Sequence, residues 1–397
     1  MAALVARPIE FRCGAFLRRY TALAQPGNGV RAARSPDWTH FQPYVAGVYR
    51  HSGVMRAQLL TTPGANLDIA LSWQQHPIPE PGPGQLQIQV TASAVCRTDL
   101  QLVSGDLPAH RLPVIPGHQV VGRVIALGAG VPAARLGERV GLVWLASACG
   151  QCRFCGSGRE NLCAEARFTG WDVDGGYATA VNARADFTHP LPDLGAQFAA
   201  SEESDAAIAP LLCGGVIGFR SLRAAGIGPE STGARLGLFG FGASALLAIQ
   251  VARHWGVRCF VVTRSIAEAA RARELGAEWA GTYDDVPPER FDAAITFAPV
   301  GWVVNDALRA LDRGGTVAIN AIHLDQIPAL DYDDLWWERS IRSVANVTRQ
   351  DVADFLQTVA AAGIRTDYEV MPLSAAATAL NRVRQGNVAG AFVLQPD

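Results

Sequence analysis

Lysine is missing from this chain, and all 34 of its basic residues are arginine. Without a lysine ammonium, the chain cannot form a Schiff base or use the phosphate-binding lysine of a P-loop. It also lacks a charge excess, because the formal net charge is −2. No run of about 18 or more apolar residues is free of charged and turn-forming residues. These absences argue against nucleic-acid and membrane partners and favour a soluble, globular, cytoplasmic protein.

The first 54 residues differ from the rest of the chain. They contain seven arginines against only Glu10 and Asp37, and they show no clear periodicity before Met55 opens a strand-like stretch. We interpret residues 1–54 either as an arginine-rich targeting segment or as upstream sequence translated ahead of a true start at Met55. The second interpretation is favoured because the segment contains no continuous amphipathic helix, and we expect it to be disordered.

Two kinds of pattern divide the remaining chain, which is long enough and apolar enough to bury two cores. Short β-type runs such as QLQIQVTASAV and QVVGRVIALG, separated by Pro and Gly clusters, predict a β-rich, barrel-like domain. From about residue 210 an apolar helical stretch, IAPLLCGGVIGFRSLRAAG, precedes alternating strands and helices, which predict a doubly wound parallel sheet. DVADFLQTVAAAG and GAFVLQP look able to return to the first domain. We therefore expect one domain of residues 55–209 and 344–397 and a second of residues 210–343.

The turn after the strand RLGLF carries the pattern G-x-G-x-x-A, formed by Gly240, Gly242 and Ala245. The first glycine can make a tight turn, the second lets the backbone approach a pyrophosphate, and the alanine permits close packing of helix on strand. The helix that follows offers unpaired N–H groups to the anion. The flanking strand and helix favour a dinucleotide site over an ordinary glycine-rich turn.

The end of the next strand bears on the choice of coenzyme. NAD-binding proteins usually place Asp or Glu there to bind the ribose 2′-hydroxyl, whereas this chain reads Thr263-Arg264-Ser265. An arginine with neighbouring hydroxyls and no carboxylate suits a 2′-phosphate, so the sequence favours NADP over NAD. The alternative is that Arg264 lies over the adenine or in solvent.

Four cysteines lie close together in a loop-like stretch: Cys149, Cys152, Cys155 and Cys163. Their spacing, C-x2-C-x2-C-x7-C, suits a closed tetrahedral site of four thiolates, with no position left for a substrate. Zinc is the expected metal, because iron–sulfur motifs rarely contain a gap of seven residues at this place. Four free or disulfide-linked thiols are the alternative. We expect a structural zinc that stabilises a lobe with few apolar residues to bury.

A second set of possible ligands is dispersed along the chain: Cys96, His118 and Cys213. Two thiolates and one imidazole would leave the fourth position of a tetrahedral zinc open for a substrate. Each residue alone is ordinary, since Cys213 on an apolar helix could be a small core residue and a histidine after glycine is often a turn residue. Only their combination suggests a catalytic site.

Six separated motifs occur in one order: VCRTDL, PGHxxxGxV, the four-cysteine lobe, GWDVDGGYA, APLLCGG and G-x-G-x-x-A. Over residues 55–397 this order resembles the zinc-containing medium-chain alcohol dehydrogenases. The stretch 334–351 is similar to a bacterial and archaeal branch of that family. The resemblance implies an α/β fold: a β-rich, chaperonin-like catalytic domain plus a Rossmann domain with a doubly wound parallel sheet. It also implies that substrate and nicotinamide meet between them, in a homodimer or homotetramer.

The resemblance also implies roles for individual residues. The catalytic zinc would be held by Cys96, His118 and Cys213. Asp99 would orient the site from behind, Thr98 would take the proton of the alcohol, and Arg97 would contact the coenzyme pyrophosphate. Two zinc ions and one NAD(P) are therefore expected per chain, together with a small alcohol or aldehyde substrate.

Two positions depart from the family pattern. Gln119 follows the zinc histidine where the family often has Glu, so a role for that carboxylate in ligand exchange is in doubt. Gln101 stands three residues after Thr98, where the family often has a histidine that passes the proton onward. The proton is therefore expected to leave through water or the coenzyme ribose.

The expected activity is reversible hydride transfer between an alcohol or aldehyde and NAD(P), with a zinc ion that polarises the substrate oxygen. Trp144, Leu145 and Trp171 are candidates for the wall of the substrate pocket, with core packing as the alternative. Three other functions stay open: a zinc dehydrogenase for a polyol or other specialised alcohol, a non-catalytic NADPH-binding relative, and a zinc-free quinone or enoyl reductase. The ligand set Cys96, His118 and Cys213 with Asp99 disfavours the last two.

Overall fold

The structure, a computed structural model, describes residues 53–397 except for 65, 193, 195–197, 199–201 and 387–389. The predicted N-terminal leader, residues 1–54, therefore lies almost entirely outside the described residues. The first described strand, β1 (Val54–Leu60), begins beside Met55.

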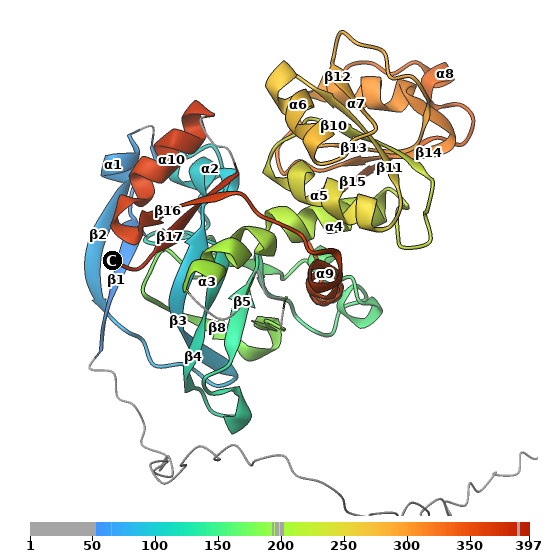
Figure 1. Ribbon diagram of the computed structural model, residues 1–397. Helices are drawn as coiled ribbons and strands as arrows, with labels where there is room; N and C mark the ends of the chain where they lie inside the picture. The colour runs from blue at the N-terminus through green and yellow to red at the C-terminus, as the bar shows by residue number, and fades with distance from the viewer. Residues whose placement is uncertain (1–52, 65, 193, 195–197, 199–201, 387–389) are drawn as a thin grey trace, which may run out of the picture. The chain divides into compact units, whose positions relative to one another are not determined.

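A seven-stranded, mostly antiparallel sheet forms the first of two β-sheet systems (Figure 1). In spatial order its main path is β16 (Tyr368–Pro372), β17 (Ala391–Gln395), β3 (Gln85–Ala94), β4 (Gln119–Leu127), β5 (Arg139–Leu142) and β9 (His189–Pro190), and β8 (Ala180–Arg184) pairs with β3 beside this path. The last strands of the chain thus join the sheet of the early strands. These short strands form the β-rich domain that the apolar runs separated by Pro and Gly predicted.

Shorter elements complete this β-rich part. They are the pair β1 and β2 (Leu71–Pro77), the pair β6 (Leu145–Ser147) and β7 (Arg167–Phe168), the helices α1 (Leu67–Ala70), α2 (Arg97–Ser104) and α10 (Ala376–Gln385), and the 3₁₀ helices η1 (Ala133–Arg135), η2 (Cys155–Ser157), η3 (Glu160–Leu162), η4 (Ala185–Phe187) and η7 (Leu373–Ala375). One apolar core joins β1, α1, α2 and α10 around the fully buried Tyr177. Helix α2 begins at the first predicted zinc ligand, so this core fixes one side of the candidate site.

The second system is a six-stranded sheet whose strands are all parallel. In spatial order the strands are β12 (Trp279–Thr282), β11 (Arg258–Thr263), β10 (Arg235–Phe239), β13 (Phe291–Thr296), β14 (Leu311–Ile319) and β15 (Ser340–Ser343). The chain order reverses direction between β10 and β13, which is the strand order of a Rossmann fold and the place where such folds bind dinucleotides. The expected fold class, a β-rich domain with a Rossmann domain, is confirmed.

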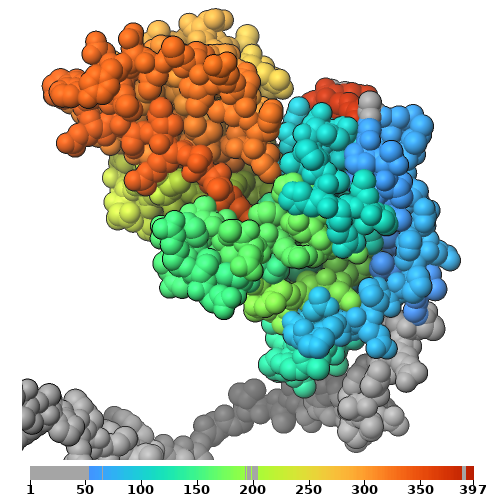
Figure 2. Space-filling model, turned by 180° about the vertical axis from the view of Figure 1, so that it is seen from behind, coloured from blue at the N-terminus to red at the C-terminus, as the bar shows by residue number. Residues whose placement is uncertain are grey.

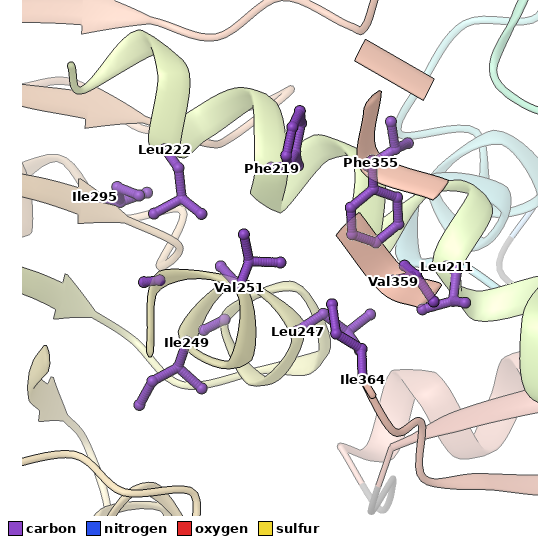
Figure 3. Close-up of a cluster of buried hydrophobic side chains, with 14 of the residues drawn as sticks. Leu211, Phe219, Leu222, Leu247, Ile249, Val251, Ile295, Phe355, Val359 and Ile364 are labelled. Atoms are coloured by element: carbon purple, nitrogen blue, oxygen red, sulfur yellow. The ribbon is translucent and has the colours of Figure 1, made fainter. Parts of the chain in front are cut away.

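Helices cover both faces of the parallel sheet, so its central strands β10, β11 and β13 are buried almost throughout. The helices of this region are α4 (Gly214–Ala224), α5 (Ala243–His254), α6 (Ile266–Glu274), α7 (Gly301–Arg309), α8 (Tyr332–Leu335) and α9 (Arg349–Ala362), whereas α3 (Glu202–Ile208) packs on β3 and β4 of the first sheet. Figure 3 shows Phe219 and Leu222 of α4, Val251 of α5 and Phe355 of α9 in one buried cluster. Helix α7 packs on the other face, with Val304 and other residues in a separate core. Burial on both faces explains why these strands read as nearly continuous apolar runs.

Helix α9 packs against α4 and α5, although the sequence analysis grouped it with the first domain. Asp351, 2% exposed, caps α9 through Thr348 and forms ion pairs with Arg220 and Arg223 of α4. Only the strands β16 and β17 that follow α9 join the first sheet.

The sequence suggested that the apolar stretch of residues 208–226 is one helix, but the structure divides it in two. Helix α3 and the 3₁₀ helix η6 (Ala209–Leu212) end at Cys213, whose dihedral angles of φ −133° and ψ −69° are not helical, and α4 starts at Gly214. By length and composition Ser204–Ala224 could cross a membrane, but 78% of its most apolar window is buried inside the protein, as in a core helix. Because of this break, Cys213 lies at the N-terminus of α4 and is not a core residue inside a helix.

Candidate metal centres and coenzyme site

Three separate elements bring Cys96, His118 and Cys213 together. Cys96 precedes the first turn of α2, His118 precedes β4, and Cys213 sits at the break before α4. One ligand atom from each residue lies within 4.8 Å of the others. Among the described residues this group has three members, which is the number of protein ligands that a catalytic zinc takes.

Asp99 fixes the orientation of the His118 ring. His118 Nδ1 lies 2.9 Å from Asp99 Oδ1, and both side chains are almost completely buried. Asp99 Oδ2 accepts hydrogen bonds from the Cys96 backbone N–H at 2.9 Å and from the Tyr177 hydroxyl at 3.1 Å. With Nδ1 held by a carboxylate, Nε2 is the ring nitrogen left for a metal, as is usual for metal-bound histidine.

The buried donor groups shift one another's protonation. A hydrogen bond with Cys213 holds the pKa of Cys96 well below its usual value, against the opposing effect of burial, and His118 lowers it further. Burial lowers the pKa of His118, but the charge of Asp99 and its hydrogen bond, together with Cys96, outweigh burial and raise the pKa to about 10. Without metal the pocket therefore favours a thiolate at Cys96, whereas the hydrogen bond to Cys96 raises the pKa of Cys213. His118 and Cys213 would each release a proton when a zinc ion binds, as metal ligands of these types do.

The neighbouring predicted residues lie at different depths. Thr98 is partly buried, with Oγ1 3.8 Å from Cys96 Sγ, whereas Arg97 is exposed. Gln119 is buried and donates to the backbone oxygen of Ala94 at 3.3 Å, so it faces the strand backbone. Gln101 is partly buried on α2. Thr98 is thus close to the donor set, and Gln119 is engaged elsewhere.

Aromatic rings stand beside the histidine of this set. The Trp144 ring lies edge-on to the His118 ring with centroids 4.7 Å apart, and it stacks with Phe168 and Trp171 at 5.4 and 5.6 Å. Trp144, Phe168 and Trp171 are only partly buried, whereas Leu145 is 1% exposed and belongs to the core. The two tryptophans are therefore placed to contact a ligand, and the expectation for Leu145 is wrong. The sequence analysis did not single out Phe168.

The four clustered cysteines converge as their spacing predicted. Their sulfur atoms lie within 4.8 Å of one another, with Cys149 and Cys155 at 3.9 Å and Cys152 and Cys155 at 3.6 Å. None of the four forms a disulfide, which removes the disulfide alternative. The lobe is anchored by polar contacts: Asn161 donates to the Ala345 oxygen, and Glu160 accepts from Arg349. Four thiols around one point fit a closed zinc site.

The glycine-rich turn lies at the carboxyl end of β10, at the reversal of strand order. Gly240 has φ 87°, and a Cβ there would come within 3.0 Å of the Ala298 backbone nitrogen after β13, so only glycine fits without strain. Gly242 is the N-cap of α5 and has open space where a Cβ would be, whereas Ala245 is completely buried. No side chain caps the first N–H groups of α5. The turn can thus accept a pyrophosphate.

Close packing of α4 on α5 brings this turn near the candidate metal site. A Cβ on Gly214, which follows Cys213, would lie 3.6 Å from Ser244 Oγ in the first turn of α5. A Cβ on Gly218, one turn further along α4, would lie 3.0 Å from the backbone oxygen of Ser244. The glycines of α4 therefore allow the two helices to approach closely, and Cys213 stands next to the dinucleotide turn.

A carboxylate from the first turn of α6 contacts the end of β11, and the sequence analysis missed it. Thr263 is completely buried, and its hydroxyl donates to Glu268, in the first turn of α6. Arg264 is 80% exposed, and its Nε lies 3.6 Å from Glu268 Oε1. The statement that this place holds no carboxylate is therefore wrong. The signal was S-x-x-E at residues 265–268, a capping pattern that puts Glu in the first helical turn beside the strand end.

A metal with three protein ligands keeps one position for a substrate oxygen, and a dinucleotide beside it can accept a hydride. A Rossmann protein that combines both belongs to the metal-dependent dehydrogenases. The comparisons with known proteins agree. The family "Alcohol dehydrogenase GroES-like domain" matches residues 82–193, and the family "Zinc-binding dehydrogenase" matches residues 245–361.

Individual relatives narrow the class further. The chain is 48% identical over 323 residues to a probable alcohol dehydrogenase, AdhA, of Mycobacterium tuberculosis, covering 80% of this chain and 90% of that protein. It is 31% identical over 315 residues to an alcohol dehydrogenase of Geobacillus stearothermophilus, covering 77% and 90%. A cobalt- and zinc-bound thermostable alcohol dehydrogenase from Pyrobaculum aerophilum superposes with a TM-score of 0.75 at 25% identity, covering 86% of this chain and all of that one.

The chain belongs to the zinc-containing medium-chain alcohol dehydrogenase family. It is a zinc-dependent alcohol dehydrogenase that transfers hydride reversibly between an alcohol or aldehyde and a nicotinamide coenzyme.

Proposed function

We propose that Cys96, His118 and Cys213 hold the catalytic zinc of this dehydrogenase and that the four-cysteine lobe holds a second, structural zinc. The observation that carries the first assignment is the convergence of two thiols and one imidazole, and Asp99 orients that imidazole. These groups lie at the start of α4, the helix that packs on the dinucleotide turn. The closed set of four free thiols supports the second.

The bound zinc supplies a Lewis acid that makes the alcohol O–H more acidic, and the nicotinamide accepts the hydride. Thr98 takes the proton of the alcohol, since its hydroxyl stands at the edge of the donor set. Asp99 keeps the His118 ring in one orientation, and Arg97 contacts the coenzyme pyrophosphate. Because Gln101 cannot carry a proton, the proton leaves Thr98 through water or the coenzyme ribose.

The coenzyme binds with its pyrophosphate at Gly240, Gly242 and Ala245, and NADP is preferred over NAD. The exposed Arg264 beside Thr263 supports this preference, because a guanidinium can pair with a 2′-phosphate. Glu268 opposes it, because its carboxylate pairs with Arg264 and can bind a free ribose hydroxyl. The reaction then belongs to the oxidations of simple alcohols with NAD or NADP as acceptor.

The substrates are primary or secondary alcohols with an apolar or aromatic carbon chain. The three stacked rings of Trp144, Phe168 and Trp171 beside His118 support this substrate class, since aromatic walls bury apolar groups. A polyol would require several polar side chains facing it.

The test is an assay of reduced-coenzyme absorbance with both coenzymes over a panel containing benzyl alcohol, an aliphatic alcohol, glycerol and a sugar alcohol. Benzyl alcohol and the aliphatic alcohol should be oxidised, with higher kcat/KM than the polyols, and chelation of zinc should abolish the activity until zinc is restored. Activity that survives complete zinc removal would overturn the catalytic assignment. A preference for polyols would overturn the substrate class alone.

A homodimer or homotetramer is also proposed. The edge strand β15 borders a surface with the exposed aromatic residues Tyr332, Trp336 and Trp337, in the segment coloured orange in Figure 2. An open strand edge beside exposed apolar groups commonly mediates association. Sedimentation analysis should show a dimer or tetramer, and a monomer at micromolar concentration would contradict this proposal.

A further inference from the structure

Tyr177 belongs to the motif GWDVDGGYA, in which the sequence analysis gave a role to Trp171 but none to Tyr177. Its side chain is completely buried. Its backbone N–H donates to the Pro116 oxygen at 2.9 Å, and its backbone oxygen accepts from Gln58 at 2.8 Å. The residue is therefore fixed from both sides, next to the segment that leads into His118.

The ring of Tyr177 lies against the backbone just before His118. A Cβ on Gly117 would come within 2.3 Å of Tyr177 Cδ1, and Gly117 has φ 94°. Glycine at 117 thus leaves the room that the ring fills. Any side chain there would displace Tyr177 or the backbone that carries His118.

The hydroxyl of Tyr177 lies on the other side of the same histidine. It donates to Asp99 Oδ2 at 3.1 Å, while Asp99 Oδ1 lies 2.9 Å from His118 Nδ1. Asp99 is 2% exposed, so water cannot replace a lost donor easily. A buried carboxylate is held in one orientation by its hydrogen-bond donors, so the loss of one donor leaves it less constrained.

We propose that Tyr177 is a positioning residue of the catalytic zinc site: its hydroxyl holds the Asp99 carboxylate that orients His118, and its ring supports the backbone before His118. The proposal rests on the assignment of Cys96, His118 and Cys213 as zinc ligands. Tyr177 does not touch substrate, because it is buried behind the carboxylate. Its effect on the reaction passes through the orientation of His118.

The alternative is that Tyr177 only fills the core around β1 and α2. Phenylalanine would fill the same volume against Gly117 and would not bury a hydroxyl. The hydroxyl contributes only through its bond to Asp99. The substitution Tyr177→Phe therefore separates the two roles, because it keeps the ring and removes that bond.

The experiment measures zinc affinity by competition with a chelator on the full chain, with two zinc ions titrated separately. Tyr177→Phe should weaken the catalytic zinc by up to about 10-fold, the lower end of the range for groups that orient a metal ligand, because Tyr177 acts on His118 through Asp99. The lobe zinc should be unchanged. The visible spectrum of cobalt(II) placed in the catalytic site should also change, because the His118 ring is less constrained. Unchanged affinity and spectrum would overturn the proposal.

Two further variants control the result. Ser221→Ala also removes a buried hydroxyl, one that donates to the Ile217 oxygen at 2.7 Å within α4, and it should leave both zinc affinities unchanged. In an Asp99→Asn background, Tyr177→Phe should change zinc affinity by less than about twofold, because Tyr177 acts through Asp99. Equal effects of Tyr177→Phe in both backgrounds would overturn the proposal. A wild-type chain that binds only the lobe zinc would instead overturn the site assignment itself.

Discussion

At the residue scale, Cys96 is the sharpest test of the proposed catalytic site. Cys96→Ser replaces a thiolate ligand by a hydroxyl, so zinc content should fall from two ions to one and activity should fall below detection. The fold should persist, because Cys96 is a single residue at the start of α2, and circular dichroism should match the wild type. Cys259→Ala, at a buried thiol outside both metal groups, should keep both zinc ions. A fully active Cys96→Ser protein with one zinc lost would contradict the catalytic assignment.

His189 gives a stability prediction that depends on pH. Burial, together with the smaller effect of the nearby Arg349 and against that of Glu160, lowers the pKa of His189 from 6.5 to about 4. Between these two values the unfolded chain binds a proton that the folded chain does not, so stability falls as the pH falls from about 6.5 to about 4. The loss approaches about 3 kcal/mol.

His189→Gln should remove this part of the pH dependence. The free energy of unfolding, measured by urea titration, should fall more steeply with falling pH for the wild type than for the variant. The stability of the variant relative to the wild type should therefore rise as the pH falls. Acid release of zinc affects both proteins and cancels in the difference. A difference that stays constant from pH about 7 to about 4.5 would refute the prediction.

Single residues also mark the limit of sequence reasoning. The spacing of the lobe cysteines predicts their convergence, because a loop of short gaps can wrap around one point. The contact of Glu268 with Thr263, and that of Tyr177 with Asp99, depend on side-chain directions that no spacing encodes. The burial of Leu145 depends on which way β6 faces.

At the scale of elements, the four-cysteine lobe should depend on its metal. Few apolar side chains of the segment 149–163 are buried, so the metal is expected to supply most of its stability. Cys155→Ala should remove one zinc ion and lower the stability of the protein by more than about 2 kcal/mol. Trypsin should then cleave faster after the exposed Arg153 and Arg159.

The Cys96→Ser variant serves as the control for this prediction, because it should lose the other zinc and keep the lobe resistant to trypsin. Equal zinc content and equal cleavage rates in Cys155→Ala and wild type would rule out a structural zinc in the lobe.

Long periodic elements were predicted well, and short or interrupted ones were not. The strand β11 and the helix α5 follow from continuous apolar runs and helical periodicity. The break at Cys213 could not be predicted, because the apolar residues on both sides have the pattern of one helix and the position of the break depends on packing against the rest of the protein. Edge strands β12 and β15 carry a weak pattern, since only one of their sides is paired.

At the scale of the whole molecule, function depends on two sites that belong to different sheets. The metal ligands Cys96 and His118 flank elements of the β-rich part, and Cys213 begins the helix that packs on the dinucleotide helix α5. A shift of α4 would therefore move Cys213 relative to both sites at once. The small residues Gly214 and Gly218 keep this distance short.

The coenzyme preference tests how the dinucleotide site distinguishes NADP from NAD. If Arg264 pairs with a 2′-phosphate, kcat/KM should favour NADP over NAD by about 10–100-fold, and Arg264→Ala should erase the difference. If Arg264 only stacks on adenine, the same change should weaken both coenzymes equally, because both carry the same ring. Glu268→Gln should raise the preference for NADP by up to about fivefold, since it removes a negative charge that competes for the guanidinium.

Arg273→Ala is the matched control, because Arg273 is an exposed arginine on α6, the helix of Glu268, and its guanidinium donates to the Ala280 backbone oxygen. It should change neither coenzyme. The outcomes also separate two roles of the Glu268 carboxylate, pairing with Arg264 and binding the ribose hydroxyls. If the wild type prefers NAD and Glu268→Gln weakens NAD alone, Glu268 binds the ribose hydroxyls and the proposed pairing of Arg264 with a 2′-phosphate is wrong. Hydride transfer at the zinc site would be unaffected by that result, because the 2′ position of the adenosine ribose takes no part in the reaction.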